Sequence, residues 1–495
     1  MSDPVSRRSF LETSATTAAA TVVARHVLGG PRHVPPSDRI NVGYVGIGTQ
    51  GVRQLIPALE RKDLRIAAVC DPNTKSDDYV EWFRNELRDK VRAFLKDPAW
   101  AEGARSSPCG REVGRELVDR HYGASGSCHA YADFREMLER EHDLDAVYVM
   151  TPDHLHATVA LAAMKAGKHV ITHKPLSNVL HEARLVAQTA RERGAATHMF
   201  CAAGETSSAD LSEWIWGGAI GPVREVHNWS TRPFWPQGMT RLPVETPAVP
   251  EGLDWDLWLG PVPHRPYHPA YTNAVFRGWY DFGTGALGDM GHYSFFQIFK
   301  ILKLGSPTTV EASRSQCWRI EEDLLWKRQP ADVAYPQASL VRWEFAARES
   351  MPPVTLHWYD GGLRPPKPVE LEQDGEPMPA EGLLFVGEQG KILAGFQGEA
   401  PRLLPRKRME RFAPPARTLA RPLEELEQWV RACRGIAPSD ASFPSVSSIS
   451  ETILIGTIAL RVEKKLRWDA ANGRFPDAPE ADALMTRQYR PGWEL

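Results

Sequence analysis

A glycine-rich turn near the start of the chain has the residue types and spacing to hold a phosphate group. The turn, Gly46-Ile47-Gly48-Thr49-Gln50-Gly51, follows an apolar run at 40–45 and precedes an amphipathic stretch at 52–61. This order predicts a strand, a tight turn and the start of a helix, whose N-terminal end favours negative charge. One glycine makes the turn, one lets the backbone approach a pyrophosphate, and one allows close packing of helix on strand. The turn is therefore a candidate dinucleotide site.

A carboxylate stands where the ribose of such a dinucleotide needs one. A second apolar run, at 66–70, ends in Asp71, twenty residues beyond Gly51. A carboxylate there can accept hydrogen bonds from both ribose hydroxyls of the adenosine but repels a 2′-phosphate. The sequence thus predicts NAD in preference to NADP, and the nearby Lys75 keeps NADP open.

The elements around these residues alternate between strand and helix as far as residue 200. After Asp71 a polar, charged stretch at about 73–122 has helical patterning near 79–95 and is interpreted as an insertion. The pattern then resumes with strands at 128–131, 146–150, 169–172 and 195–200, and with helices that begin at Asp133, end at Gly167, and run over 177–193. We predict an α/β Rossmann domain at 37–200, with a doubly wound parallel sheet.

Beyond Cys201 the residue pattern favours β-strands, and Pro, Gly and Trp residues are frequent. Strands are predicted at 223–230, 309–317, 339–345, 354–359 and 383–386, and late helices at 422–434 and 446–465. This succession predicts an α+β domain at 201–495 with a large, mainly antiparallel open sheet, which would serve substrate binding and oligomerisation.

The first residues have the composition of an export signal. Ser6-Arg7-Arg8-Ser9-Phe10-Leu11 precedes an alanine- and threonine-rich segment, and a Gly/Pro-rich link follows at 29–36. Residues 1–36 resemble a twin-arginine signal and linker; the alternative is a basic N-terminal tail. The resemblance implies the twin-arginine export machinery as a partner and a periplasmic or otherwise exported protein. Because that route carries folded proteins, we expect a tightly held NAD that is regenerated in place.

The overall composition gives no indication of nucleic-acid binding, membrane association or a metal site. The chain has 495 residues and a net charge of -3 from 59 basic and 62 acidic residues, which gives no bias toward nucleic acid or an anionic membrane. Outside the leader we find no run of the ~18 apolar residues that span a bilayer. The six cysteines show no metal-ligand spacing, so we expect no metal site. Cys109 and Cys128 are the candidate disulfide.

Two further motifs complete a family pattern. They are the loop Thr151-Pro152-Asp153-His154-Leu155-His156 and the dipeptide Lys174-Pro175, each of which follows a predicted strand. With the glycine turn and Asp71, the chain resembles the glucose-fructose oxidoreductase, inositol dehydrogenase and rhizopine-catabolism (Gfo/Idh/MocA) family. The resemblance implies homo-oligomers that pair their large sheets. It also implies these cofactor-binding residues: Gly46, Ile47, Gly48, Gln50, Gly51, Asp71, Thr151, Pro152, His154, His156 and Lys174.

The lysine motif departs from the family at one position. The family usually has Glu-Lys-Pro where this chain has His173-Lys174-Pro175. In the family the lysine lies beside the nicotinamide and the reacting carbinol, which implies a catalytic role for Lys174. A histidine in place of the glutamate removes a carboxylate and can alter the protonation of the lysine.

A second departure affects the acid-base residue. The family motif Gly-Ala-Leu-x-Asp-x-x-x-His reads here as Gly285-Ala286-Leu287-Gly288-Asp289-Met290-Gly291-His292-Tyr293. Asp289 matches the aspartate, but Tyr293 stands where the histidine is expected. His292 comes one residue early, which is about 100° around a helix. Three possibilities follow. Tyr293 shares proton transfer with Lys174, or irregular backbone turns His292 toward the site, or neither residue serves as the acid-base residue.

Aromatic and polar residues in two later segments are candidates for the substrate side. Trp235 and Gln237 lie in the string 232–237, and Arg277 and Trp279 lie in the cluster 277–281. Stacking by tryptophan with amide or charged hydrogen bonds suits a polyhydroxylated ligand. For each of these four residues, packing between the two domains is an equally good explanation.

These observations favour an exported NAD-dependent oxidoreductase that acts on a CH–OH group of a sugar or polyol. One alternative is a redox-neutral glycoside-cleaving enzyme, in which NAD oxidises a ring hydroxyl transiently. A second alternative is a sugar-binding protein that keeps NAD as a structural element, because the expected histidine is missing.

Overall fold

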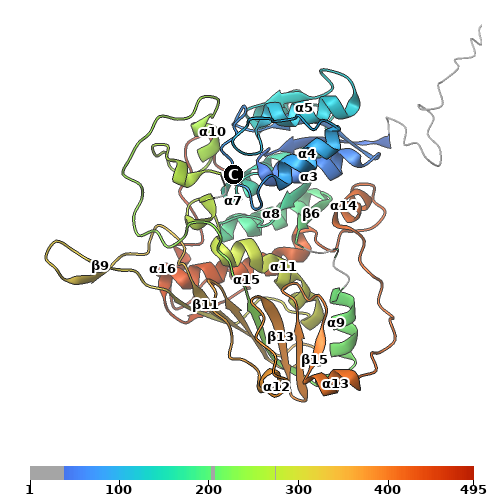
Figure 1. The fold of residues 1–495 in the computed structure, drawn as a ribbon, viewed down its shortest axis with the longest axis vertical. Coiled ribbons are helices and arrows are strands. Elements are labelled where there is room, and N and C mark those ends of the chain that lie inside the picture. Colours follow the sequence, from blue (N-terminus) through green and yellow to red (C-terminus); the bar gives the residue numbers. More distant parts are fainter. Residues whose placement is uncertain (1–37, 202–203, 205–206, 274) are drawn as a thin grey trace, which may run out of the picture.

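Three layers make up the part of the chain that the structure describes. The computed structural model describes residues 38–201, 204, 207–273 and 275–495, so the twin-arginine motif lies outside the described residues. A parallel sheet with its helices lies at one end and a large sheet at the other (Figure 1). Between them lie α8 (Leu180–Arg193), α11 (Gly285–Leu302) and α15 (Phe443–Val462).

The first sheet has the predicted doubly wound arrangement. Its six strands are all parallel, in the order β3-β2-β1-β4-β5-β6. The strands are β1 (Ile40–Val45), β2 (Leu64–Cys70), β3 (His129–Tyr131), β4 (Ala146–Val149), β5 (His169–His173) and β6 (Thr197–Phe200). Besides α8, the helices are α3 (Thr49–Glu60), α4 (Glu86–Leu95), α5 (Arg111–Tyr122), α6 (Phe134–Arg140) and α7 (Asp153–Lys165). The strand order reverses between β1 and β4, and ligands bind at the carboxyl ends of strands beside such a point.

The segment interpreted as an insertion contains two different parts. Helix α5 packs against β2 and β3 through buried Val113, Leu117 and Val118, so it occupies the place of an ordinary crossover helix. The residues between Asp71 and α5, which include α4, are the addition to the parallel sheet. Charged residues of both signs on the outer face of α5 make its apolar face difficult to recognise in the sequence.

The second sheet has eight strands in the order β15-β14-β13-β7-β12-β11-β8-β16. Its neighbouring strands are antiparallel except β7 and β12, which are parallel. The strands are β7 (Val223–Trp229), β8 (Thr309–Arg314), β11 (Ser339–Phe345), β12 (Val354–Tyr359), β13 (Gly382–Gly387), β14 (Gly390–Ala394), β15 (Arg402–Leu404) and β16 (Leu466–Arg467). The predicted large, mainly antiparallel open sheet is confirmed.

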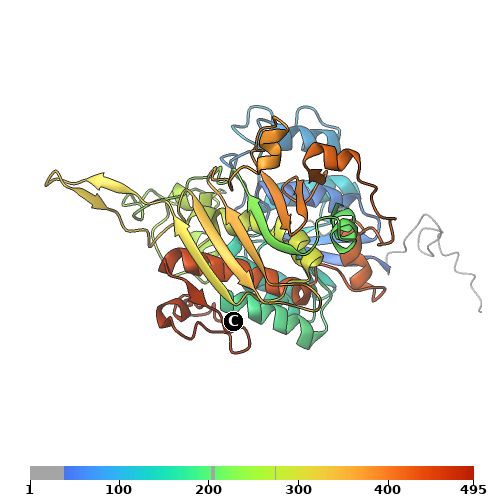
Figure 2. The ribbon, with the colours of Figure 1, turned by 90° about the horizontal axis from the view of Figure 1, so that it is seen from below.

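Shorter elements surround the second sheet. A two-stranded hairpin, β9 (Trp318–Ile320) with β10 (Trp326–Arg328), projects away from the body (Figures 1 and 2). The remaining elements are α9 (Ser207–Trp216), α10 (Trp255–Leu259), η2 (Pro269–Tyr271), η3 (Val275–Gly278), α12 (Val369–Gln373), α13 (Arg406–Glu410), α14 (Glu425–Cys433) and α16 (Pro479–Asp482).

The two faces of the large sheet differ in their cover. The inner face packs on α11 and α15 through buried aromatic side chains such as Trp343, Trp358 and Phe295. On the outer face, Leu371 of α12 packs on the β13–β15 end. Figure 2 shows this face from below, and no helix of the described chain lies over β12, β11 and β8.

Two late helices are bound into the interior. Among the described residues, α15 is the one helix long and apolar enough to cross a membrane, but 78% of its apolar window is buried, as in a core helix of a folded domain. Helix α14 returns to the first sheet, where Trp429 packs edge-on against Tyr148 of β4 at a ring distance of 6.2 Å. The core of the first sheet therefore includes residues beyond the predicted boundary at 200.

The candidate disulfide does not form. Cys109 and Cys128 are both free and buried, as are Cys70 and Cys201. Helix α5 has 12 residues and separates the two candidates. At 1.5 Å rise per residue it holds its ends ~18 Å apart, whereas a disulfide needs Cα atoms within ~7 Å.

Candidate functional site

The glycine turn has the geometry that a dinucleotide requires. Gly46 has a φ of +100°, and a Cβ there would lie 2.4 Å from the carbonyl carbon of Met150. A Cβ on Gly51 would lie 2.1 Å from the carbonyl oxygen of Gly46, so neither position accepts a side chain. Helix α3 begins at Thr49, and no side chain caps its first turn. Its free N–H groups can therefore bind the phosphates of NAD.

Asp71 lies at the end of β2 beside this turn. Its carboxylate accepts hydrogen bonds from the backbone N–H groups of Ile47 at 2.6 Å and Asn73 at 2.8 Å. Burial raises the pKa of Asp71 to about 6, and these two hydrogen bonds oppose the shift. Arg111 of α5 donates to the Asp71 carbonyl at 3.1 Å, and its charge also opposes the shift, whereas Lys75 is exposed. Sequence reasoning missed Arg111 because α5 was assigned to an insertion.

A cleft opens at the carboxyl ends of β1, β2 and β4. The predicted residues that line it are Gly46, Gly48, Gln50, Gly51, Asp71, Thr151, Pro152 and Arg277. It is also lined by Thr49, Pro72, Tyr79, Met150, Leu155, Trp258, Asn273 and Phe276, which sequence reasoning did not single out. The cleft thus lies between the parallel sheet and the segment around α10 and η3, where a dinucleotide would bind.

Two segments that each contribute residues to the lining of this cleft are hydrogen-bonded to each other, and we call the pair the clasp. One is 72–78, directly after Asp71, and the other is 252–273 around α10. Thr74 N donates to Gly252 O at 2.8 Å, and Asp254 N donates to Pro72 O at 3.0 Å. Asn273 Nδ2 donates to Asp78 O at 3.4 Å. The clasp therefore connects the first domain to the second beside the cofactor cleft.

The two predicted loop histidines lie beneath the cleft and do not line it. His154 is fully buried, its Nε2 lies 2.9 Å from Trp258 O, and burial lowers its pKa to about 3. The ring nitrogens of His156 face Pro175 O at 2.6 Å and Thr151 O at 2.7 Å. Both histidines therefore hold the surrounding loops in place.

Lys174, Asp289 and Arg277 form a buried charge cluster. Lys174 follows β5, is 3% exposed, and pairs through Nζ with Oδ1 of Asp289 on α11. Arg277 Nε donates to the same oxygen at 2.9 Å. Burial would raise the pKa of Asp289, but the two cations hold it below its ordinary range. Burial lowers the pKa of Lys174, and Asp289 opposes that shift.

Tyr293 joins this cluster one helical turn after Asp289. Its ring centre lies 4.9 Å from Lys174 Nζ, and its hydroxyl lies 3.3 Å from Nε2 of His173. Burial raises the pKa of Tyr293 well above its ordinary value, and Asp289 adds to the shift. Burial and Lys174 lower the pKa of His173. Both groups are therefore neutral at neutral pH.

His292 lies on another face of α11. It is fully buried, with Nδ1 2.7 Å from Gly288 O and Nε2 3.3 Å from Ser450 Oγ of α15. Burial lowers its pKa to about 3. The helix is regular here, so the rotation of about 100° per residue directs His292 toward α15 and Tyr293 toward Lys174. The structure does not bring His292 into the Lys174 cluster.

The predicted substrate residues fall into two groups. Trp279 is 2% exposed, and its Nε1 donates to Ala270 O at 2.7 Å, so it packs inside an aromatic cluster and does not line the cleft. Trp235 is half-buried, and its ring centre lies 5.9 Å from the guanidinium carbon of Arg277. Gln237 accepts from Trp235 Nε1 at 3.0 Å and donates to Pro336 O. Gln237 therefore supports Trp235 from behind.

Sequence reasoning missed one residue of the Thr151 loop. The side chain of Asp153 is 2% exposed, and its Oδ2 accepts from Thr284 Oγ1 at 2.7 Å. Thr284 is the residue before α11, so this bond fixes the start of that helix against the first domain. The signal was present, because Asp153 lies inside the quoted motif.

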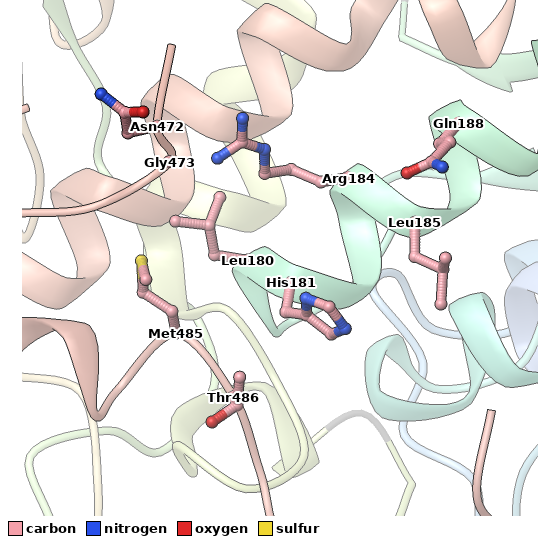
Figure 3. A pocket seen from close by; sticks show the side chains of 9 residues that line it. All are labelled: Leu180, His181, Arg184, Leu185, Gln188, Asn472, Gly473, Met485 and Thr486. Atoms are coloured by element: carbon pink, nitrogen blue, oxygen red, sulfur yellow. The ribbon is translucent and has the colours of Figure 1, made fainter. Parts of the chain in front are cut away.

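A separate pocket lies between α8 and the C-terminal segment (Figure 3). Leu180 and Arg184 of α8 point toward Gly473 and Asn472 across it, and His181 also contributes to the lining. The Arg184 guanidinium already donates a hydrogen bond within the protein, to Ala470 O at 3.1 Å. None of the predicted site residues lines this pocket.

Comparison with known proteins gives two matching family models. Residues 114–200 match the NAD-binding Rossmann fold of the Gfo/Idh/MocA oxidoreductase family. Residues 221–322 match the C-terminal alpha/beta domain of that family. The first match begins within α5, so it leaves out the glycine turn and Asp71.

Individual relatives are distant. The protein named glycosyl hydrolase family 109 protein 2, from Shewanella sp. (strain ANA-3), is 29% identical over 194 residues, which cover 36% of this chain and 35% of that protein. The chain thus spans about a third of the length of the curated relatives that it matches first.

Solved structures share the fold at low identity. The WlbA dehydrogenase from Bordetella pertussis, in complex with NADH and UDP-GlcNAcA, has a TM-score of 0.54 and 14% identity over 87% of this chain and 99% of that one. An aldose-aldose oxidoreductase from Caulobacter crescentus, complexed with glycerol, has a TM-score of 0.51 and 14% identity over 87% and 99%. The NAD-binding Rossmann domain and the open sheet that follows are thus similar, at residues 114–200 and 221–322, to the two domains of the Gfo/Idh/MocA oxidoreductase family.

Proposed function

We propose that this protein is an exported NAD-dependent oxidoreductase that acts on a CH–OH group of a sugar or polyol. The observation that carries the proposal is the buried cluster of Lys174, Asp289 and Tyr293, beside a cleft that Arg277 also lines. A lysine ammonium held by a carboxylate in a buried site can polarise a hydroxyl or carbonyl oxygen. The half-buried indole of Trp235 offers a stacking surface for a sugar ring.

The residues of the chain manage the proton of the reacting hydroxyl. Gly46, Gly51 and Asp71 would hold NAD, which would supply a hydride acceptor for the carbinol carbon. The Lys174 ammonium stabilises the negative charge that grows on the oxygen as its proton leaves. Tyr293 takes this proton at its phenol oxygen and passes its own proton to Nε2 of neutral His173. The same path returns the proton when a carbonyl compound is reduced.

The clasp supports a cofactor that stays bound between turnovers. Its hydrogen bonds join segment 72–78, directly after the ribose-binding Asp71, to residues 252–254 of the second domain. Dinucleotide release would require these bonds to open, which slows dissociation. A protein loaded with NAD before export by the twin-arginine route would need such retention, and a second, carbonyl-bearing substrate would then regenerate the cofactor.

The test uses full-length protein purified without added cofactor. Mass spectrometry of the released ligand should identify NAD, and a panel of sugars and polyols should change the absorbance near ~340 nm. Lys174→Ala should keep the NAD and lose the change. Bound NAD with no response to any sugar would contradict the proposal, and so would full activity of Lys174→Ala.

Redox-neutral glycoside cleavage is the second candidate. The observation in its favour is the similarity to proteins named as glycosyl hydrolase family 109 members. Such a reaction returns the hydride to its own substrate, so a clasped cofactor would need no second substrate. Release of an aglycone from aryl glycosides without net NADH would establish it. Strict dependence of turnover on an added carbonyl acceptor would exclude it.

A sugar-binding protein that keeps NAD as a structural element is the third reading. It predicts sugar binding without turnover in both the native chain and Lys174→Ala. Calorimetric titration with the sugars of the panel separates this outcome from an enzyme that has lost a catalytic group.

A further inference from the structure

Two histidines face each other on the outer surface of the large sheet. His227 of β7 and His357 of β12 are direct partners in the parallel register of these strands. Their rings stack at 4.6 Å with 13° between the planes. Neighbours on either side, such as Val226, Leu356 and Trp358, point into the core, so both histidines point away from α11. The pair thus lies outside the cofactor cleft and the Lys174 cluster.

A carboxylate completes the group. Glu225 precedes His227 by two residues, which places it on the same face of β7. Its Oε2 lies 3.2 Å from His227 Nε2. One ligand atom from each of Glu225, His227 and His357 lies within 4.8 Å of the other two. Imidazole nitrogens and a carboxylate oxygen are the donors that Zn²⁺ takes in proteins.

Tyr359 orients one of the two imidazoles. The hydroxyl of Tyr359, also on β12, lies 3.1 Å from His227 Nδ1. If Nδ1 donates to this hydroxyl, the lone pair of Nε2 faces the Glu225 carboxylate. Two acceptors that face each other repel, and a cation between them removes the repulsion. Histidines that bind metals commonly donate their second N–H to a fixed acceptor in this way.

The charge around the group suits a metal. Arg342 lies opposite His357 on β11, but its guanidinium donates to Glu311 at 2.8 Å and pairs with Glu344 at 2.9 Å. The positive charge nearest to the group is therefore held by two carboxylates.

We propose that Glu225, His227 and His357 bind one divalent transition-metal ion, with Zn²⁺ as the representative ion. Zinc–ligand bonds of about 2.0–2.2 Å place tetrahedral ligand atoms about 3.5 Å apart. The side chain of Glu225 is 51% exposed, so it can move the remaining distance without disturbing the sheet. A water molecule completes the tetrahedron on the solvent side. The ion connects the one parallel pair of strands in the sheet.

The test measures Zn²⁺ binding to the full-length, tag-free protein after treatment with a chelator. Calorimetry should give one Zn²⁺ per chain, and Co²⁺ should give the visible absorption of a tetrahedral site at the same stoichiometry. His357→Gln and His227→Gln should each weaken Zn²⁺ binding more than tenfold. Tyr359→Phe should weaken it by about tenfold through the lost hydrogen bond. Anomalous scattering at the zinc edge should place the ion between the three side chains.

A matched control separates this site from general surface binding. His181→Gln removes an exposed histidine of α8 and should leave both stoichiometry and affinity unchanged. Native protein that binds no Zn²⁺, or equal weakening by His181→Gln and His357→Gln, would overturn the proposal. Circular dichroism of each variant confirms that the sheet is intact, and the NAD content should be the same in all of them.

Discussion

The hydroxyl of Tyr293 lies 3.3 Å from Nε2 of His173, so the end of β5 and the middle of α11 meet through a tyrosine and a histidine. In the family pattern a glutamate precedes the lysine and the histidine stands on the helix. Here the strand end supplies the imidazole and the helix supplies a phenol. The two departures from the pattern are thus neighbours in space, and Lys174 Nζ lies 4.9 Å from the centre of the Tyr293 ring.

Removal of the Tyr293 hydroxyl should abolish most turnover. Tyr293→Phe keeps the ring beside Lys174 but breaks the path to His173, so we expect kcat to fall by about 10²–10⁴-fold. The NAD content should not change, because Tyr293 does not line the dinucleotide cleft. Tyr280→Phe is the matched control and should retain activity. If Tyr293→Phe and Tyr280→Phe have equal kcat, the proton does not pass through Tyr293.

The charge cluster predicts unequal effects on stability. Asp289→Asn leaves the buried cations Lys174 and Arg277 without their shared carboxylate, which should lower the free energy of unfolding by about 3–5 kcal/mol. Lys174→Met should cost less, because Arg277 still donates to Asp289. Urea unfolding followed by tryptophan fluorescence measures both values. A larger loss in Lys174→Met than in Asp289→Asn would contradict the shared role of Asp289.

Cofactor retention should depend on pH through Asp71. Burial raises the pKa of this carboxyl to about 6, above the ~3.9 of an unfolded chain. Only the ionised form accepts hydrogen bonds from both ribose hydroxyls, so NAD affinity should fall as the pH drops through 6. Without cofactor, the folded state binds the extra proton between these two pKa values, so its stability should fall as pH rises across that window.

Equilibrium dialysis of NAD from about pH 8 to about pH 5 measures the effect on retention. Asp71→Asn should bind NAD more weakly and without this pH dependence. Equal pH dependence in the native protein and Asp71→Asn would assign the effect to another group.

The clasp can be loosened at a single glycine. Gly252 has a φ of +86°, and a Cβ there would lie 3.3 Å from Cβ of Thr74. Gly252→Ala should push the two segments apart and raise the NAD dissociation rate by about tenfold, measured by exchange with labelled NAD. Gly218→Ala is the matched control, because its φ of +80° gives similar strain with no atom within 4 Å. Equal dissociation rates in the two variants would show that the clasp does not retain the cofactor.

The parallel sheet and its glycine turn could be predicted because their signals are local. Gly46, Gly51 and Asp71 lie within one strand-helix-strand unit, and each has a task that the residue type alone identifies. The same applies to Lys174, which follows a strand at the expected edge. The placement of these residues depends on short stretches of backbone, and the local sequence is enough to predict such stretches.

Contacts between distant segments could not be predicted in this way. The choice between His292 and Tyr293 depends on which side of α11 meets β5, and the burial of Trp279 depends on how η3 packs. The pairing of His227 with His357 depends on the register of two parallel strands that are 130 residues apart. Because His357 lies far from His227 in the sequence, local spacing does not indicate a metal site there.

Helix α14 has a consequence for how the chain is made. Trp429 and Leu426 fill part of the core of the first sheet, against Tyr148 and its neighbours. During synthesis, β6 leaves the ribosome long before α14 does. The apolar surface of the first sheet around Tyr148 therefore stays uncovered until α14 has been made. Bound NAD would then indicate that synthesis of the chain has passed residue 433.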